Sequence, residues 1–404
     1  MESNNPQLEE KQAVPPIKSG SKGWLVFLIL GIIGILGGIA SILVVLLWPE
    51  EILPDFNFPQ VPSKNESKKY YSNLTGLEVA DETAINMPTY CIQTPNGTDG
   101  ARPQVGLTQA GVVFEAIAEA GITRFAAIYQ NSTSAVIGPI RSLRIYYLQW
   151  DTPFDCTIVH AGGADDAIAA LRAGGYKDLT ENYTYMYRGT NSVRRWNNLF
   201  TTANNLAQMN ADRGYGGSNV TGFTRMTPEE AVKTRVDNGV AAKLKITEGT
   251  TENTAKIIPT VTNIAMRFGY AANFNVNYNY DAETNSYKRS YESGNPHEVY
   301  VCPNENLGEV NPEDTCTLAQ LSPAVVVAMI VEERKASDGY HESITTIGTG
   351  EAYVFQNGGV IKGSWSKNSV GEQIKFFDGD GKEIALVPGQ TFVEAVPTYG
   401  NVEY

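Results

Sequence analysis

The sequence predicts an α/β N-terminal domain with a mostly parallel sheet, followed by a mainly antiparallel β C-terminal domain and preceded by one transmembrane helix. Three observations lead to this fold class. An uncharged apolar run occupies 23–48, strand-like and helix-like patterns alternate over 73–225, and β-rich runs broken by Asn-Gly and Asp-Gly turn signals dominate 226–404. The 404 residues, 42% of them hydrophobic, suffice for two buried cores.

The apolar run is long enough to cross a hydrocarbon core of about 30 Å, so we expect a transmembrane helix at 24–48. A cleaved signal peptide is the alternative, but its shorter apolar core would end at a small-residue cleavage site, and VVLLWPEE is not one. Lysines precede the run and acidic residues follow it. The positive-inside rule then predicts a cytoplasmic tail at 1–23, a single-pass anchor in the cell membrane and an extracytoplasmic remainder, which begins with a stalk linker at 49–72.

The α/β domain at 73–225 is predicted from an alternating order of elements. The expected strands are PTYCIQ, ITRFAAIYQ and CTIVHAGG, and the expected helices are LTQAGVVFEAIAEAG, IRSLRIYYLQW and ADDAIAALRAGG, the first capped by Thr108. By the right-handed crossover rule, this order gives a parallel sheet with helices on its faces. An excursion rich in tyrosine and arginine follows over 176–220 and contains a further predicted helix, TTANNLAQMNADRG.

The β-rich domain is predicted at 226–404. It opens with a short helix, TPEEAVKTRVDNG, whose Thr-x-Glu start is typical of a capped N-terminus. The runs after 242 include AVVVAMIVEE, GEAYVFQNGGVIKGSWS and QIKFFDGDGKEIALVPGQTFVEAVP. Their Asn-Gly and Asp-Gly pairs indicate hairpins, so an antiparallel arrangement is expected.

The formal charge of −13 falls on the part of the chain after the apolar run, because charges in the tail cancel. An acidic surface argues against nucleic acid as a partner, and any anionic ligand needs a local basic site. The sequence has no G-x-G-x-x-G, no P-loop, no G-x-S-x-G elbow and only three histidines. We therefore expect no nucleotide cofactor and no histidine-rich metal site.

Four cysteines in an oxidising compartment suit disulfides. Cys302 and Cys316 bracket a short polar loop, and we predict that they are bonded. Cys91 and Cys156 lie in two predicted core strands, where a disulfide and two separate buried thiols are equally consistent with the pattern.

The candidate binding residues lie where helices follow predicted strands, because ligands of a parallel α/β sheet bind beyond the carboxyl ends of its strands. They are Arg102, Gln104, Glu115, Arg141, Ser142, Arg144, His160, Gly162, Gly163, Asp165, Arg188 and Asn198. Each also has a structural alternative, such as surface ion pairing for Arg102, stabilisation of its own helix for Asp165 and simple packing for His160. Arg124 is expected near the opposite edge of the sheet, in a structural pair with Glu119.

Three stretches in order, ARPQVGLTQAGVVFEAIAEAGITRFAAIYQ, IGPIRSLRIYYLQW and DCTIVHAGG, resemble the YerB-like family of bacterial lipoproteins, which is built from a domain of unknown function. NLTGLEVADE resembles its opening segment, and GTGEAYVFQNGGVIKGSWSKNS through LVPGQTFVEAVP resembles its C-terminal β domain, so the resemblance covers about 73–400. It implies an envelope location and a two-part fold, and no activity comes with it.

Two departures from the family pattern stand out. The lipid-modified cysteine of a lipobox is replaced by the apolar run, and the family's Pro-His-Asn-Leu run is replaced by Trp196, Asn197, Asn198 and Leu199. If the missing histidine is an acid or base in the family, this chain would be inactive. If it is a ligand contact, Asn197 would replace it in part.

Three hypotheses for function follow from the sequence. The leading one is a membrane-anchored extracytoplasmic protein that binds an anionic or carbohydrate-like ligand of the cell envelope in the α/β crevice, through Arg102, Arg141 and Arg144. The second is a cell-wall hydrolase that uses Glu115 or Asp165 with His160. The third is a scaffold that binds another envelope protein through the aromatic excursion. The sequence leaves open whether the protein is an enzyme.

Overall fold

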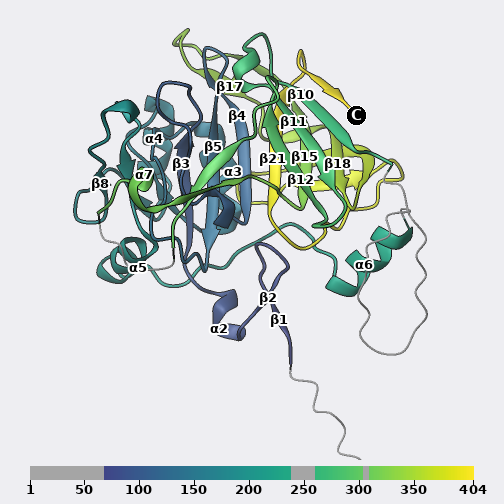
Figure 1. Cartoon of the computed structure of the whole chain (residues 1–404), viewed down its shortest axis with the longest axis horizontal. Helices are drawn as coiled ribbons and strands as arrows, with labels where there is room; N and C mark the ends of the chain where they lie inside the picture. The colour runs from purple at the N-terminus through teal and green to yellow at the C-terminus, as the bar shows by residue number, and fades with distance from the viewer. Residues whose placement is uncertain (1–67, 238–259, 304–308) are drawn as a thin grey trace, which may run out of the picture. The chain divides into compact units, whose positions relative to one another are not determined.

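A ten-stranded mixed sheet joins the two halves of the chain. The structure is a computed structural model that describes residues 68–237, 260–303 and 309–404. In spatial order the strands of the sheet are β20 (Lys375–Asp378), β19 (Gly359–Lys367), β18 (Gly348–Gln356), β15 (Val325–Val331), β21 (Thr391–Pro397), β4 (Val112–Glu119), β5 (Ile122–Gln130), β3 (Thr89–Pro95), β6 (Thr157–Val159) and β7 (Asp178–Leu179). In Figure 1 the yellow β21 lies between the blue β4 and the green β15. The predicted boundary at 225/226 stays a prediction, but strands from both sides of it share one sheet.

The prediction of a mostly parallel sheet for 73–225 is wrong. In this half, β3 pairs in parallel with β6, and β6 with β7, but β4–β5 and β5–β3 are antiparallel. The error comes from VVFEAIAE, which was predicted as a helix and forms β4. A short continuous apolar run fits a buried strand as well as a buried helix, and the following Ala120-Gly121 pair, with φ values of 50° and 76°, makes a tight hairpin turn to β5.

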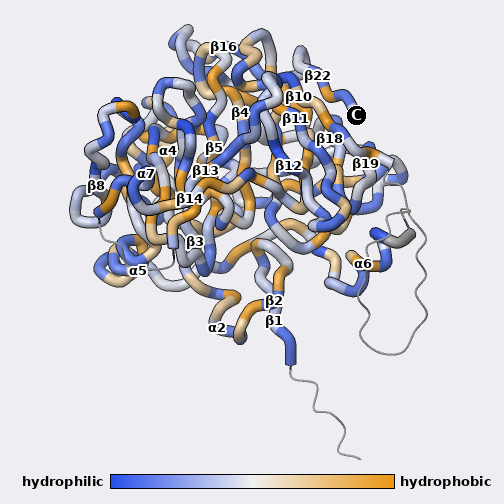
Figure 2. Tube along the Cα trace, viewed as in Figure 1, coloured by the Kyte–Doolittle hydropathy of each residue, from blue (hydrophilic) through white to orange (hydrophobic). Residues whose placement is uncertain are grey.

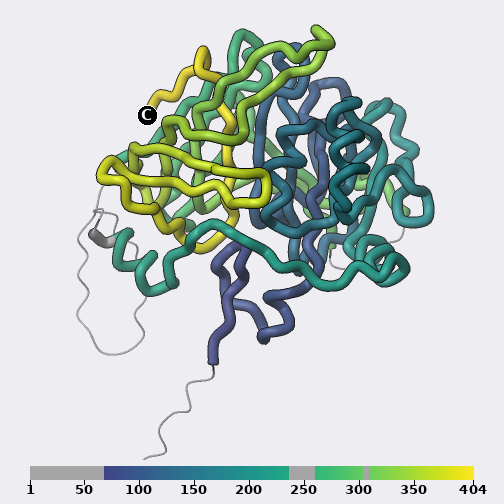
Figure 3. Tube along the Cα trace, turned by 180° about the vertical axis from the view of Figure 1, so that it is seen from behind, coloured from purple at the N-terminus to yellow at the C-terminus, as the bar shows by residue number. Residues whose placement is uncertain are grey.

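Helices cover the sheet beside β3–β6 on one face. These are α3 (Ile145–Asp151) and α4 (Asp165–Ala173), whose residues Tyr147, Trp150 and Leu171 pack with Phe114 of β4 in the largest core cluster. Figure 3 shows this side of the molecule from behind, with both helices in dark teal over the blue strands. The helix predicted at ADDAIAALRAGG is confirmed as α4, and the one predicted at IRSLRIYYLQW is confirmed as α3, which begins later, at Ile145, and ends at Asp151.

The opposite face of the sheet carries a second cluster. It contains Val113, Phe125 and Phe392, and it is covered by α5 (Ala203–Asp212) and by the hairpin β13 (Glu298–Val301)–β14 (Thr317–Gln320). The predicted helix TTANNLAQMNADRG is therefore confirmed as α5. Orange, apolar stretches in Figure 2 follow the sheet strands, as expected for strands that are buried on both faces.

A four-stranded antiparallel sheet packs on the C-terminal half of the large sheet. Its strands are β12 (Ser286–Tyr291), β11 (Val276–Asp281), β10 (Asn263–Arg267) and β22 (Asn401–Glu403). Tyr278 and Met266 of this sheet share a core with Val326 and Val396 of the large one. The mainly antiparallel β arrangement predicted for the second half is confirmed, with the parallel β15–β21 pair as the exception.

The remaining elements are short. Three two-stranded ribbons are β1 (Tyr70–Tyr71)–β2 (Glu78–Val79), β8 (Tyr187–Arg188)–β9 (Leu199–Phe200) and β16 (Glu333–Lys335)–β17 (Glu342–Ile344). The other helices are α2 (Glu82–Ile85), α6 (Pro228–Asp237) and α7 (Pro312–Thr315). At the start of α6, Thr227 Oγ1 accepts from the Glu230 amide at 3.2 Å and Glu230 accepts from the Thr227 amide at 2.8 Å, so the predicted cap is confirmed as a reciprocal capping box.

Two disulfides tie the chain. Cys302–Cys316 closes the polar loop, as predicted, and Cys91–Cys156 joins β3 to the residue just before β6. The second pairing, which the sequence leaves open, follows from the parallel register of these strands, in which Cys91 lies beside Ile158. All four cysteines are therefore oxidised.

The predicted transmembrane helix at 24–48 lies outside the described residues, as do the tail and most of the stalk linker. Within the part of the chain that the structure describes, no helix has the length and apolarity needed to cross a membrane.

Candidate functional site

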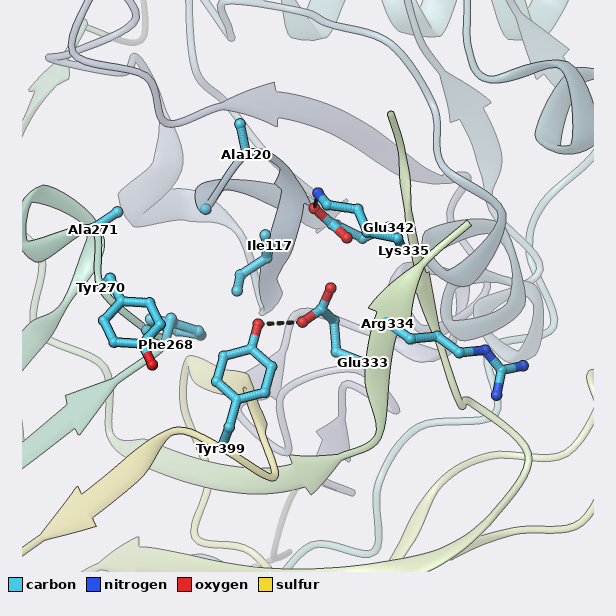
Figure 4. A pocket seen from close by; sticks show the side chains of 12 residues that line it. Ile117, Ala120, Phe268, Tyr270, Ala271, Glu333, Arg334, Lys335, Glu342 and Tyr399 are labelled. Carbon is cyan, nitrogen blue, oxygen red and sulfur yellow. Dashed lines mark hydrogen bonds and ion pairs between the residues drawn. The ribbon is translucent and has the colours of Figure 1, made fainter. Parts of the chain in front are cut away.

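A pocket opens beside the tip of the β4–β5 hairpin and has a volume of about 510 Å³. We call it the acidic pocket. The hairpin contributes Ile117, Ala120 and Gly121, and the β16–β17 ribbon contributes Glu333, Lys335 and Glu342. Phe268, Tyr270 and Tyr399 supply aromatic walls from the C-terminal half (Figure 4).

Local backbone chemistry brings these segments together. Gly121 has φ +76°, and a Cβ at this position would lie 3.2 Å from the Cβ of Ala271, so glycine permits both the turn and the approach of the neighbouring loop. At the base of the tip, Glu119 forms a bridge with His341, which holds the β16–β17 connection against β4. The pocket is thus formed by segments more than 140 residues apart, because Gly121–Ala271 and Glu119–His341 are both long-range neighbours.

Two carboxyl groups face each other in this pocket. Glu342 is 5% exposed; its Oε1 pairs with the Lys335 ammonium, and its Oε2 has no hydrogen-bond partner among the described residues. Glu333 accepts from the Tyr399 hydroxyl (Figure 4). Burial raises the pKa of Glu333, and the hydrogen bond with Glu342 and the negative charge of Glu342 raise that pKa further. A protonated Glu333 would supply the donor that Glu342 Oε2 lacks.

Aromatic side chains give the pocket its apolar surface. Tyr270 is fully exposed, and Tyr399 is 57% exposed although its hydroxyl is bonded to Glu333. Burial and then the Glu333 hydrogen bond raise the pKa of Tyr399, so its hydroxyl stays protonated and remains a donor. Concave sites that combine aromatic walls with a few convergent polar groups are typical of small-molecule binding.

A second feature of the structure is a buried polar network beneath β4 and β21. Glu115 of β4 and Glu394 of β21 lie opposite each other in register, and both are fully buried. Arg289 of β12, also fully buried, pairs with Glu115 and lies 3.7 Å from Glu394 through its Nε. Burial and then the charge of Glu115 raise the pKa of Glu394 well above its usual range, so Glu394 is protonated. The guanidinium of Arg289 therefore faces one carboxylate, that of Glu115.

The network continues as a directed chain of hydrogen bonds. Arg289 donates to His297 Nδ1, and His297 Nε2 lies 2.9 Å from Gln104 Oε1. Gln104 Nε2 donates to Asn96 Oδ1 at 3.0 Å, and Asn96 Nδ2 donates to Glu115 at 3.0 Å. This pattern requires a neutral His297 protonated on Nε2. Burial, then the charge of Arg289, lowers the pKa of His297 well below its ordinary value, in agreement with that state.

Three predicted site residues therefore belong to this network and its edge. Gln104 and Glu115 are fully buried members, and Arg102 donates from Nε to Asn96 Oδ1 at 2.9 Å. The prediction that placed Glu115 in the helix LTQAGVVFEAIAEAG is wrong, because Glu115 lies on β4. Its carboxylate also accepts from Thr123 at 2.5 Å, so it is saturated by protein donors.

Arg144 has a structural contact in the fold. Arg144 is the N-cap residue of α3, but its side chain makes no capping hydrogen bond. Its Nη2 lies 2.6 Å from Glu119 Oε2, and Arg124 Nη2 lies 2.8 Å from Glu119 Oε1. Burial raises the pKa of Glu119, but the charges of Arg124 and Arg144 more than offset this, and the net pKa is lowered. The predicted Arg124–Glu119 pair is confirmed, and this ion triad anchors the hairpin whose tip lines the acidic pocket.

His160 directly follows β6 and is buried. Its Nδ1 lies 2.7 Å from the Gly162 carbonyl and its Nε2 lies 2.9 Å from Asp178 Oδ1, so both ring nitrogens have protein partners. Gly162 has φ +68° with open space around it, and Gly163 forms a bridge with Leu143. Ser142 donates to the Ala161 carbonyl at 3.0 Å, and Asp165 is exposed at the start of α4. The binding roles predicted for these residues stay predictions.

The loop after β5 carries Arg141 back toward β3. Because β5 is antiparallel to β3, the carboxyl ends of these two strands point in opposite directions. The loop nevertheless brings Arg141 back to β3, where the Arg141 amide donates to the Gln93 carbonyl at 2.7 Å. Its side chain donates to Asn197, which in turn contacts Asp99. Arg188 contacts Asn198 at 2.8 Å and Glu181 at 2.6 Å. Asn197 is buried and Arg188 is exposed, and none of these contacts involves Arg102.

Two family models match the chain. "Protein of unknown function (DUF3048) N-terminal domain" matches residues 74–216, and the corresponding C-terminal domain matches residues 264–393. The chain belongs to the DUF3048 family. It is 26% identical over 340 residues to "Putative lipoprotein YerB" of Bacillus subtilis (strain 168), a match that covers 82% of this chain and 87% of that protein. The crystal structure of the YerB protein from Bacillus subtilis matches with a TM-score of 0.63 at 22% identity and covers 83% of this chain and 100% of that one.

The family resemblance found in the sequence is thus confirmed, and the structural match shows a shared fold. In this DUF3048 member, sequence reasoning missed Glu333, Glu342, Tyr270, Arg289 and His297. All five lie in the second half of the chain, which the sequence presents as plain β structure. The one available signal was charge on predicted strands, since acidic and basic residues inside β-rich runs such as AVVVAMIVEERK and SYKRSY require partners when buried.

Proposed function

We propose that the protein is a membrane-tethered extracytoplasmic protein that binds a carbohydrate-like ligand of the cell envelope in the acidic pocket. The location is supported by two disulfides, which persist in oxidising compartments, and by the lipoprotein relative. The predicted span at 24–48 would be the tether, with the N-terminus in the cytoplasm.

One observation carries the choice of ligand. Glu333 and Glu342 bring two carboxyl groups to a pocket whose wall also includes the fully exposed ring of Tyr270. Carboxyl oxygens accept hydrogen bonds from sugar hydroxyls, and an aromatic ring covers the apolar C–H face of a sugar. A pocket of about 510 Å³ accommodates one or two sugar rings, within the usual range for small ligands.

The test is calorimetric binding of short N-acetylglucosamine oligomers to the full-length protein. Tyr270→Ala should weaken binding by about 2- to 10-fold through loss of the stacking surface. Glu342→Gln should weaken it by about 10-fold or more, because a hydrogen bond to a charged group is replaced by a weaker one. Trp196→Ala is the matched control, since Trp196 is 69% exposed and does not line the pocket. Equal effects of Tyr270→Ala and Trp196→Ala would contradict the proposal.

A catalytic role is the second candidate. A carboxyl with a raised pKa beside a second carboxyl is the arrangement that a general acid requires, and Glu333 beside Glu342 has it. The earlier hydrolase hypothesis has less support, because the oxygens of Glu115 and the nitrogens of His160 are already bonded to protein groups. Release of reducing ends from the same oligomers, abolished by Glu333→Gln, would favour catalysis over binding.

A further inference from the structure

A second pocket, of about 440 Å³, lies on the other side of the loop that lines the acidic pocket. Ala271 belongs to the acidic pocket, whereas the next two residues, Ala272 and Asn273, line the second one. The rest of its wall comes from Arg102, from Tyr291 at the end of β12 and from the turn that follows, which includes Asn295. We call it the Arg102 pocket.

The guanidinium of Arg102 is held in place before any ligand arrives. Its Nε donates to Asn96 Oδ1 at 2.9 Å, and its Nη2 donates to the Asn273 carbonyl at 3.0 Å. The group lies over the ring of Tyr291, with 4.0 Å from the guanidinium carbon to the ring centroid. Asn96 is fully buried and is itself fixed by Gln104 and Glu115, so the buried network sets the position of Arg102.

This arginine has no anionic partner among the described residues. Arg124, Arg144 and Arg194 each make an ion pair with a glutamate, but no carboxylate oxygen lies within ion-pair distance of Arg102 in the described ranges. Its Nη1 also has no hydrogen-bond acceptor there. Burial, opposed in part by neighbouring tyrosine and glutamate groups, lowers the pKa of Arg102, as expected for a desolvated cation without a paired anion.

The surroundings of Arg102 favour an anionic ligand beside its Nη1 group. The Tyr291 hydroxyl is buried and has no hydrogen-bond partner among the described residues, and burial raises the pKa of Tyr291 to about 12, so the hydroxyl stays protonated and can donate. The one carboxylate in the pocket wall, Glu292, is engaged by Arg267 at 3.2 Å and by Asn275 at 2.8 Å. A planar, bidentate acceptor is the group that a fixed guanidinium edge recognises best.

We propose that the Arg102 pocket binds the carboxylate group of a small acidic molecule, such as a uronic acid, through the free edge of Arg102 and the Tyr291 hydroxyl. This site is separate from the acidic pocket and does not depend on the function proposed for it. The ligand class differs as well, since one pocket presents carboxyl oxygens and the other presents a cation.

The experiment is titration of the full-length protein with D-glucuronate, D-glucose and inorganic phosphate, followed by isothermal calorimetry. Glucuronate should bind, and glucose, which has the same ring without the carboxylate, should bind at least 10-fold more weakly. Equal binding of the two sugars would overturn the proposal. Phosphate that binds as tightly as glucuronate at Arg102 would overturn the carboxylate assignment.

Variants locate the site. Arg102→Gln should weaken glucuronate binding by about 10- to 100-fold, and Arg172→Gln, at an exposed arginine outside the pocket, should leave it unchanged. Tyr291→Phe keeps the ring beneath Arg102 and removes the hydroxyl, so it should weaken binding several-fold even if Arg102→Gln fails to fold. Tyr270→Ala should leave glucuronate binding intact, which separates this result from the test of the acidic pocket. Unchanged affinity in Tyr291→Phe together with Arg102→Gln would refute the assignment.

Discussion

Replacement of Arg289 by methionine should be among the most destabilising single changes in this protein. Arg289 lies between Glu115 and Glu394, which are fully buried neighbours across the β4–β21 pairing, and it also donates to His297. Methionine has a similar length but no charge and no donor. The change therefore leaves the Glu115 carboxylate buried without its cation.

The expected loss follows from this geometry. Removal of one partner of a buried ion pair costs about 3–5 kcal/mol. For a unit that spans 68–404, the unfolding entropy near 60 °C is on the order of 0.7 kcal/mol/K, so the melting temperature should fall by about 4–7 °C.

The assay is thermal unfolding of the full-length protein, followed by far-ultraviolet circular dichroism, which reports on its β structure. Glu115→Gln in the Arg289→Met background should recover at least half of the loss, because it removes the uncompensated charge. Arg188→Met is the control, since its pair with Glu181 is partly exposed and contributes about 1 kcal/mol or less. If Arg289→Met and Arg188→Met shift the melting temperature equally, the reasoning about the buried network is refuted.

Three further outcomes are expected. Cys302→Ser, which opens a loop with a sequence separation of 14, should cost about 3 kcal/mol, and an unchanged denaturation midpoint would argue against the bond to Cys316. Thr227→Ala should cost about 1 kcal/mol through loss of the cap, and Thr227→Ser should restore most of it; amide exchange of α6 measures both. Folding lowers the pKa of His297, so below about pH 6.5 the unfolded chain binds more protons than the folded chain. Lowering the pH therefore removes the stability that neutral His297 contributes. The stability gap between wild type and His297→Leu should therefore shrink by about 1.4 kcal/mol per pH unit below pH 6.5, and a gap independent of pH would contradict a neutral His297.

Local interactions explain which elements the sequence predicts correctly. The helices α4, α5 and α6 are set by their own residues, through acidic first turns or caps such as Thr202 and Thr227. The Cys302–Cys316 bond likewise closes a short loop. Strand β4 fails because VVFEAIAE carries no period that separates a buried strand from a buried helix, and only its pairing with β5 and β21 decides between them.

The candidate sites also divide into features that local sequence determines and features that tertiary contacts determine. By itself the sequence determined the family, the local helices, one disulfide and the candidate role of Arg102 as a binding residue. Tertiary structure decided everything that joins the two halves: Glu115 meets Arg289 across 174 residues, and Gly121 approaches Ala271 beside the acidic pocket. The physical reason is that a charged residue on a strand has the same local pattern whether it faces water or a buried partner. Only the register of the sheets selects which of the two it meets.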